Sequence, residues 1–214
     1  MAEVEKSYTP REEFLNTATH LTGVIFSVAG IFYLLQCRMV KGEALGMAAG
    51  LFYGASLVFM FGCSALYHSC TRPELRKKLR QLDHSAIYFL ITGSYAGLLY
   101  VVSRDLTGSV IFALLVLLSI LGTAGRFFNW QSFRKIEIVL YVIMGWCCVA
   151  IAGKLIRHLP SSLLWLLLSG GIAYTVGAIL FGLGKKLKWM HSVFHIFVVL
   201  GSLLQFFCVA EYVF

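Results

Sequence analysis

The chain has 214 residues, of which 59% are hydrophobic and 13% are charged, and its mean hydropathy is +0.81. A water-soluble globular chain carries about 25% charged residues, so this composition excludes a soluble domain. The apolar residues fall into runs of about 20, which is the length of helix that crosses a bilayer. We therefore expect an all-α, polytopic membrane protein.

The sequence predicts a bundle of seven transmembrane helices. They are expected at residues 18–36, 44–67, 85–102, 107–125, 136–156, 161–182 and 190–211. Residues 18–214 would form a single domain. A short cytoplasmic segment at 1–17 would precede it, and this segment lacks the basic start and apolar core of a signal peptide. Within it, Pro10 followed by Glu12 and Glu13 favours a helix start.

The basic residues predict the orientation of the bundle. The N-terminal segment and the connections after the second, fourth and sixth helices carry 13 of the 18 lysines and arginines. The positive-inside rule therefore places these parts in the cytoplasm, with the N-terminus inside and the C-terminus outside. The net charge of +8 reflects this topology and contact with anionic lipid. Because the basic residues are scattered over short loops, no nucleic-acid partner is expected.

The connection at residues 74–82 has a pattern of its own. Leu75, Leu79 and Leu82 fall on one helical face, with basic residues around the rest. We expect a short separate helix that lies along the membrane surface.

Polar residues from three segments are predicted to meet at one depth of the membrane. The stretch WMHSVFHIFV places His191 and His195 four residues apart, on one helical face at the start of the seventh helix. His68 ends the second helix with Ser64 one turn before it, and Asp83 opens the third. At about 1.5 Å per residue, all five lie within about 10 Å of the cytoplasmic ends of their helices.

Three histidines with an open fourth position are a ligand set of catalytic zinc. We therefore predict Zn²⁺ held by His68, His191 and His195, with Asp83 and Ser64 in catalytic roles beside it. Zinc lowers the pKa of a coordinated water to about 7, and Asp83 could accept its proton and later protonate a leaving group. Two histidines four apart also occur by chance, and membrane histidines serve in proton relays or interhelical hydrogen bonds, so the residues alone leave these alternatives open.

Four segments together resemble the motifs of the haemolysin III family. They are EEFLNTATHLTG, SALYHS, LDHSAIYFLITGSY and WMHSVFHIFVVLG. The family belongs with the progestin and adipoQ receptors and, more distantly, with the alkaline ceramidases. The resemblance implies a seven-helix bundle with its N-terminus inside. It also implies a zinc ion near the cytoplasmic face, held by His68, His191 and His195, with Ser64 and Asp83 close to it.

The resemblance also carries an expected activity. Relatives in the wider group hydrolyse the amide bond of ceramides, and others act as receptors. A zinc-dependent hydrolase of a lipid amide or ester is therefore favoured, in a bacterial inner membrane and with a membrane lipid as substrate. Glu13, Asn16 and His20 match the family's first motif. A role around the metal or at the substrate entrance is expected for them, with helix capping and interfacial solvation as the alternative.

Two other functions stay open at this point. A transporter or proton relay would spread polar residues through the membrane depth, whereas here they cluster at one end. A receptor or membrane regulator with a structural zinc would need a closed site with four ligands. Asp83 distinguishes the two functions: as a fourth ligand it would close the site of a regulator, and as a free carboxylate it would serve a hydrolase.

The remaining polar residues are expected to have structural roles. Arg126 and Glu137 can pair, His84 packs or anchors a loop, and His158 is exposed at the outer end. The six cysteines contain no CxxC pair, and most lie inside apolar runs where cysteine behaves as a small hydrophobic residue, so no disulfide is expected.

Overall fold

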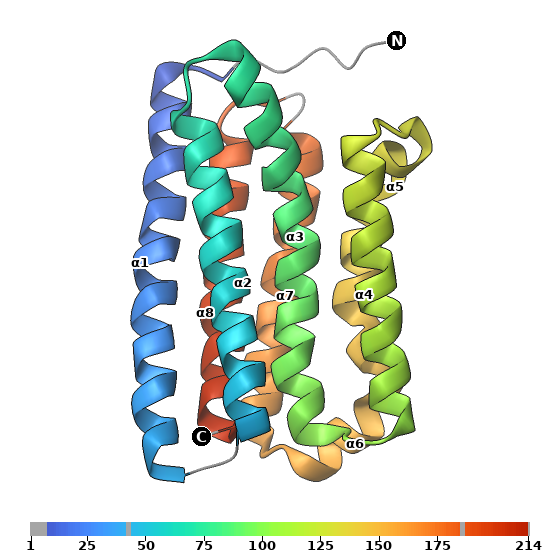
Figure 1. Ribbon diagram of the computed structural model, residues 1–214. Coiled ribbons are helices and arrows are strands. Elements are labelled where there is room, and N and C mark those ends of the chain that lie inside the picture. The colour runs from blue at the N-terminus through green and yellow to red at the C-terminus, as the bar shows by residue number, and fades with distance from the viewer. Residues whose placement is uncertain (1–7, 42–43, 185–186, 214) are drawn as a thin grey trace.

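The computed structural model describes residues 8–41, 44–184 and 187–213, which fold into a bundle of helices (Figure 1). In chain order these are α1 (Pro10–Lys41), α2 (Ala44–Ser69), α3 (Pro73–Val102), α4 (Leu106–Phe127), α5 (Gln131–Gly145), the 3₁₀ segment η1 (Trp146–Ile151), α6 (Ala152–His158), α7 (Ser161–Leu183) and α8 (Met190–Val213). Seven stretches of the described residues are long and apolar enough to cross a membrane, and each overlaps one expected run. The predicted all-α bundle of seven membrane-spanning helices is confirmed.

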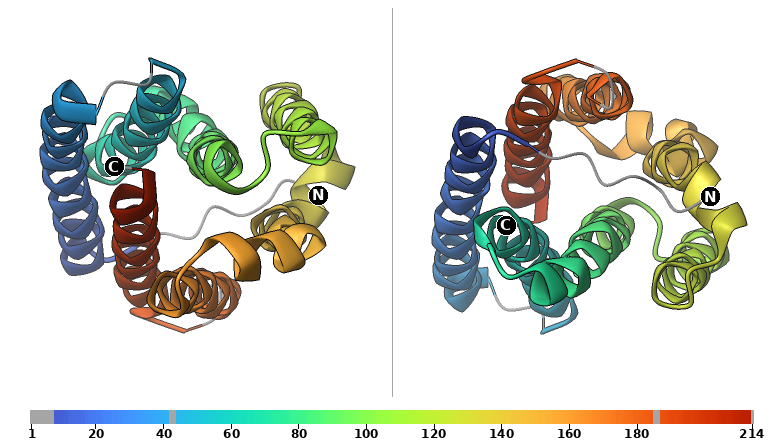
Figure 2. Two further views of the ribbon diagram at one scale, coloured as in Figure 1. Left: turned by 90° about the horizontal axis from the view of Figure 1, so that it is seen from below. Right: turned by 90° about the horizontal axis from the view of Figure 1, so that it is seen from above.

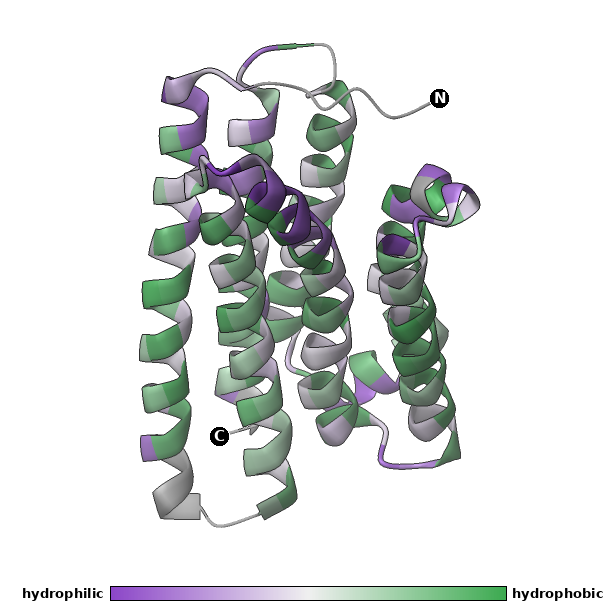
Figure 3. Ribbon diagram, turned by 45° about the horizontal axis from the view of Figure 1, so that its top comes forward, coloured by the Kyte–Doolittle hydropathy of each residue, from purple (hydrophilic) through white to green (hydrophobic). Residues whose placement is uncertain are grey.

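Successive spans run in alternating directions, so α1 begins and α8 ends at opposite ends of the bundle (Figure 1). We call the end at which α1 begins the N-terminal end; the charge pattern predicts that it is cytoplasmic. α8 packs against α7 and α1 and also contacts α2 and α3. End-on views show α4 and α5 on the side of the bundle away from α1 (Figure 2). Hydrophilic residues gather in the first turns of α3 at the N-terminal end (Figure 3).

α1 begins at Pro10, about two turns before the first expected span. Thr9 and Glu12 form a capping box at its start. The Glu12 backbone N–H donates to Thr9 Oγ1 (3.3 Å), and the Thr9 backbone N–H donates to Glu12 Oε2 (2.9 Å). Glu12 Oε1 also accepts a hydrogen bond of 2.9 Å from the backbone N–H of Trp189. Trp189 has φ of 66°, a strained value for a bulky side chain. The hydrogen bond from its backbone N–H to Glu12 helps to hold this conformation, and it ties the entry to α8 to the start of α1.

The structure corrects the expectation of a separate surface helix at residues 74–82. These residues are the first turns of α3, which is one continuous helix. Pro73 occupies a position at which proline favours a helix start, and no further proline or glycine interrupts these turns. Arg76 also fixes the connection to α2, because its Nη1 donates to the carbonyl oxygens of Tyr67 (3.2 Å) and Cys70 (3.0 Å).

The fifth span is not the single regular helix expected at 136–156. α5 ends at Gly145, and the 3₁₀ segment η1 follows before α6 begins. Tyr95 of α3 satisfies the backbone at this change: its hydroxyl donates to the Gly145 carbonyl (2.9 Å) and accepts from the Cys148 backbone N–H (2.6 Å). A side chain is needed here because lipid offers the backbone no hydrogen bonds.

Glycines allow α1, α2 and α3 to approach closely. A Cβ atom at Gly54 of α2 would lie 2.5 Å from the side chain of Ile31 on α1, and one at Gly93 of α3 would overlap Ser56 on α2. Close contact of this kind holds membrane helices together, since lipid is as apolar as their side chains.

A buried ion pair joins α4 to α5 near the N-terminal end. Arg126 Nε donates to Glu137 Oε1 at 2.8 Å, and the two side chains are 8% and 7% exposed. Glu137 also accepts from the Tyr141 hydroxyl (2.9 Å) and lies 3.2 Å from His84 Nδ1 on α3. The expected pairing of Arg126 with Glu137 is confirmed, His84 anchors α3 to the pair, and His158 is exposed as expected.

We predict that Glu137→Ala lowers the free energy of unfolding by about 3–5 kcal/mol, because Arg126 would remain buried without its carboxylate. Thermal and denaturant unfolding of the detergent-solubilised protein measures this. The double variant Arg126→Met/Glu137→Leu removes both charges and should be close to wild type, and Glu74→Ala, at an exposed position, is the control. A loss below about 1 kcal/mol would show that the pair is of the weak, solvated kind.

Candidate metal centre

Three histidines converge at the N-terminal end of the bundle. His68 comes from the last turn of α2, and His191 and His195 come from the first two turns of α8. They are 3%, 7% and 1% exposed. His191 Nε2 lies 3.3 Å from His68 Nε2 and 3.1 Å from His195 Nε2. One ring nitrogen from each histidine lies within 4.8 Å of the others, so this buried cluster could hold a metal ion.

Residues of α1 set the direction in which two of these rings present their lone pairs. His68 Nδ1 lies 2.6 Å from Glu13 Oε2 and donates to it. His195 Nδ1 lies 3.3 Å from the backbone carbonyl of Asn16 and donates to that oxygen. A neutral imidazole that donates from Nδ1 keeps a lone pair on Nε2. The Nε2 atoms of His68 and His195, which face the centre of the cluster, are therefore acceptors.

The donor set fits a zinc ion. Tetrahedral zinc holds imidazole nitrogens at about 2.0–2.1 Å, which places them about 3.3–3.4 Å from one another. The two Nε2–Nε2 separations of 3.3 Å and 3.1 Å are close to this value. The Nε2 atoms of His68 and His195 are acceptors, so the cluster can be joined by a proton on His191 Nε2 or by a metal ion bound to all three rings.

The two α1 residues that contact His68 and His195 are themselves held in place. Glu13 pairs with Arg76 of α3 through its other oxygen, Oε1. The Asn16 side chain is fully buried, and its Oδ1 accepts from Ser192 Oγ at 2.7 Å. Such partners orient metal-ligating histidines and raise their basicity.

His20, one turn after Asn16, touches the cluster differently. Its ring stacks on that of His195, with centroids 3.8 Å apart and an angle of 17° between the planes. The structure thus brings Glu13, Asn16 and His20 against the three histidines, as positions of α1 that share one face.

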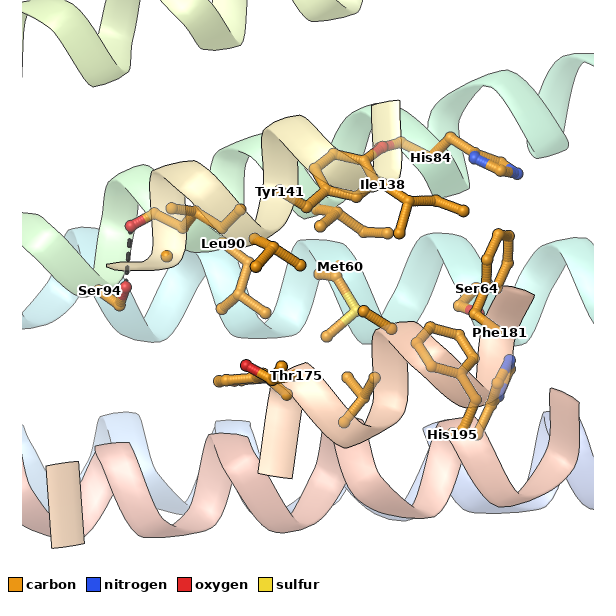
Figure 4. Close-up of a pocket in the computed structure, with 18 of the residues that line it drawn as sticks. Met60, Ser64, His84, Leu90, Ser94, Ile138, Tyr141, Thr175, Phe181 and His195 are labelled. Carbon is orange, nitrogen blue, oxygen red and sulfur yellow. Dashed lines mark hydrogen bonds between the residues drawn. The ribbon is translucent and has the colours of Figure 1, made fainter. Parts of the chain in front are cut away.

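Ser64 and Asp83 lie in the wall of a cavity beside the histidines. The cavity measures about 140 Å³, and its wall includes His191 and His195. Figure 4 shows Ser64 and His195 at the same end of it. Its remaining wall is mostly apolar and comes from α2, α3, α5, α7 and α8: Met60, Ile87, Leu90, Ile138, Phe181 and Val198 are examples. Among the described residues, Asp83 is not one of the group whose ligand atoms lie within 4.8 Å of one another.

Tyr8 is a residue of this site that the sequence analysis did not find. Its ring stacks on His191 (centroids 4.7 Å apart, 22° between planes) and meets the ring of His68 at 5.9 Å. Burial raises the pKa of its hydroxyl above the ordinary value. Tyr8 precedes every apolar run and belongs to no periodic pattern, so only its position just before the helix cap at Thr9 could have pointed to it.

The comparisons with known proteins agree with the motifs. The family model described as "Haemolysin-III related" matches residues 8–206. The chain is 37% identical to hemolysin-3 of Bacillus cereus over 203 residues, covering 95% of this chain and 92% of that protein. It is 34% identical to the hemolysin-3 homolog of Bacillus subtilis (strain 168) over 208 residues, covering 96% of both. The human monocyte to macrophage differentiation factor matches at 22% identity over 208 residues, covering 95% of this chain and 85% of that protein.

The two bacterial relatives match over nearly their whole length, and the family model covers all three histidines of the cluster. Together with seven helices that are able to span a membrane, these matches confirm the resemblance seen in the motifs. The chain is a multi-pass integral membrane protein that belongs to the haemolysin III family.

Proposed function

We propose that this protein is a zinc-dependent hydrolase that cleaves an amide or ester bond of a membrane lipid near the cytoplasmic face. The observation that carries the proposal is the position of the histidine cluster at one end of an apolar cavity. Three buried imidazoles supply nitrogen ligands, and the cavity beside them contains a carboxylate, Asp83, and a hydroxyl, Ser64.

His68, His191 and His195 would hold the zinc. Three protein ligands leave a position for a reactant, as in catalytic rather than structural zinc sites. When bound, zinc would lower the pKa of a water and polarise the carbonyl of the scissile bond. Glu13 and the Asn16 carbonyl would keep His68 and His195 in the tautomers that bind a metal.

Asp83 would move the proton. Its carboxylate lies in the cavity wall with His191 and His195, outside the group of metal ligands, so it is available as a base. It would accept a proton from the attacking water and return it to the leaving amine or alcohol. Ser64, in the same wall, would donate a hydrogen bond that orients the substrate.

The rest of the cavity suits an acyl chain. Apart from the histidines and the few other polar residues, the lining of the cavity is aliphatic and aromatic. A second cavity of about 300 Å³ shares part of this wall, at Ser94, Tyr95, Trp146, Gly171 and Gln205, and continues toward the other end of the bundle. An extended chain would follow this path while its polar bond stays at the metal. A membrane lipid of the bacterial inner membrane is the proposed substrate.

A regulatory role with a structural metal is the second candidate. The observation that favours it is the cover over the cluster: Tyr8 stacks on His191, and Glu12 ties the start of α8 to the start of α1. In such a protein the metal would hold α2 and α8 together for a partner, and no lipid would be cleaved.

The first prediction from the proposed function concerns the bound metal. Protein purified in detergent without chelator should contain about one zinc per chain, and His191→Ala/His195→Ala should contain none, because it loses two of three ligands. Elemental mass spectrometry measures this. His158→Ala, at the exposed histidine, is the matched control. If the wild-type protein contains no metal, the hydrolase proposal is wrong, and a histidine-based proton relay becomes the favoured function.

The second prediction concerns Glu13. Glu13→Gln should weaken zinc binding by about 10–100-fold, because the carboxylate partner of His68 Nδ1 is lost while the side chain keeps its size. Competition with a zinc-binding dye measures the affinity, and Glu74→Gln is the control. Unchanged affinity would mean that Glu13 serves only its ion pair with Arg76.

The third prediction separates the two candidate functions. Zinc-loaded wild type should cleave some members of a panel of acyl amides and acyl esters in mixed micelles. Asp83→Asn should lower the rate by about 10²–10⁴-fold, the usual contribution of a proton-transfer group, while zinc content is unchanged. Product formation is followed by mass spectrometry. Zinc-loaded wild type without hydrolysis of any panel member would favour the regulatory role.

A further inference from the structure

His20 is a buried histidine whose nitrogens have no partner in the chain. It is 2% exposed, and neither Nδ1 nor Nε2 has a hydrogen-bond partner among the described residues. Leaving a buried polar group unsatisfied costs about 1–3 kcal/mol. The contacts of its ring do not remove that cost, because His195 stacks on one face and Phe61 packs edge-on at 5.2 Å. Neither aromatic ring gives the two imidazole nitrogens a conventional hydrogen-bond partner.

The place of His20 indicates what could satisfy it. Unpartnered buried polar atoms also occur at Tyr53, Ser85 and Thr123, but His20 alone of these four residues lines the cavity beside the histidine cluster. A molecule in that cavity would therefore lie against the His20 ring. A neutral imidazole offers one donor and one acceptor, which matches a hydroxyl or an amide.

The charge of the cavity wall narrows the class of molecule. The described residues that line the cavity include no lysine or arginine, and Asp83 is the one carboxylate among them. Sites that bind phosphate use arginine, lysine or helix N-termini to balance its charge. A metal at the histidine cluster would add positive charge, but the scissile carbonyl and Asp83 would compete for it. An uncharged head group suits this wall better than a phosphate.

We propose that His20 is a substrate-binding residue that hydrogen-bonds an uncharged hydroxyl or amide in the head group of a single-chain lipid. The inference rests on the proposed function for the location of the site, although it does not require that the lipid is cleaved. His20 would hold the head group while the acyl chain extends along the apolar wall formed by residues such as Leu90 and Val198.

Two probes with the same chain and linkage test the proposal. These are 1-oleoylglycerol and 1-oleoylglycerol 3-phosphate, which differ only in the phosphate. Binding to the zinc-loaded, full-length protein in detergent is measured by native mass spectrometry, and any cleavage is read from the same spectra. The variants are His20→Phe, which keeps an aromatic ring for stacking, and His158→Phe, the matched control at an exposed histidine. Zinc content and Tm are recorded for each.

Wild type and His158→Phe should bind 1-oleoylglycerol more tightly than its phosphate. His20→Phe should bind 1-oleoylglycerol about tenfold more weakly, as expected for the loss of a buried hydrogen bond, while zinc content stays unchanged. Unchanged affinity in His20→Phe would overturn the proposal and make His20 a packing residue. Equal or tighter binding of the phosphate by wild type, or binding of neither probe, would also overturn it.

A second variant keeps the test decisive where His20→Phe fails to fold or to bind zinc. His20→Gln retains one donor and one acceptor, so it should stay within about threefold of the wild-type affinity for 1-oleoylglycerol. A tenfold loss in this variant with zinc retained would contradict the proposal. Because binding and cleavage are read separately, absence of cleavage with an intact preference for the uncharged probe would count against the hydrolase and not against the role of His20.

Discussion

The close approach of three imidazole nitrogens between α2 and α8 is the constraint on which the site depends. His191 Nε2 lies 3.3 Å and 3.1 Å from the acceptor Nε2 atoms of His68 and His195, and the three buried rings could hold a metal ion. α1 supplies the hydrogen-bond acceptors that turn two rings toward the centre. Glu13 also pairs with Arg76 of α3. Four helices are therefore held at the N-terminal end by contacts that converge on one cluster.

Polar and apolar side chains are segregated within the bundle. His191, His195 and Asp83 line the cavity, and aliphatic and aromatic side chains form most of the rest of its wall. Elsewhere in the described part of the chain, most buried polar groups have hydrogen-bond partners within the protein. The Tyr95 hydroxyl, for example, bonds the backbone where α5 ends, and Glu137 accepts from Arg126. Membrane burial makes such satisfaction necessary. It is against this background that we propose a ligand for the unsatisfied nitrogens of His20.

The match to relatives supports a shared scaffold more than a shared activity. Two bacterial proteins at 34–37% identity and a human protein at 22% all align over nearly the full length of this chain. Their names refer to lysis and to cell differentiation, which are different processes. A buried histidine cluster beside an apolar cavity could serve either catalysis or regulation. Among the described residues Asp83 is outside the group of possible metal ligands, as the proposed open site requires.

The sequence by itself determined the seven spans and the residues that could bind a metal. Hydropathy is a property of each segment alone, and the spacing of His191 and His195 places them on one face of any helix. The depth of His68 could also be read from its position at the end of an apolar run. Only the tertiary structure decided that α2 lies beside α8, that Glu13 reaches His68, and that Tyr8 covers His191. It also decided that residues 74–82 continue α3 and that η1 interrupts the fifth span. The contacts between helices depend on which helices are neighbours. Neighbours are set by packing between segments, such as Gly54 against Ile31, and a pattern within one segment does not record that packing.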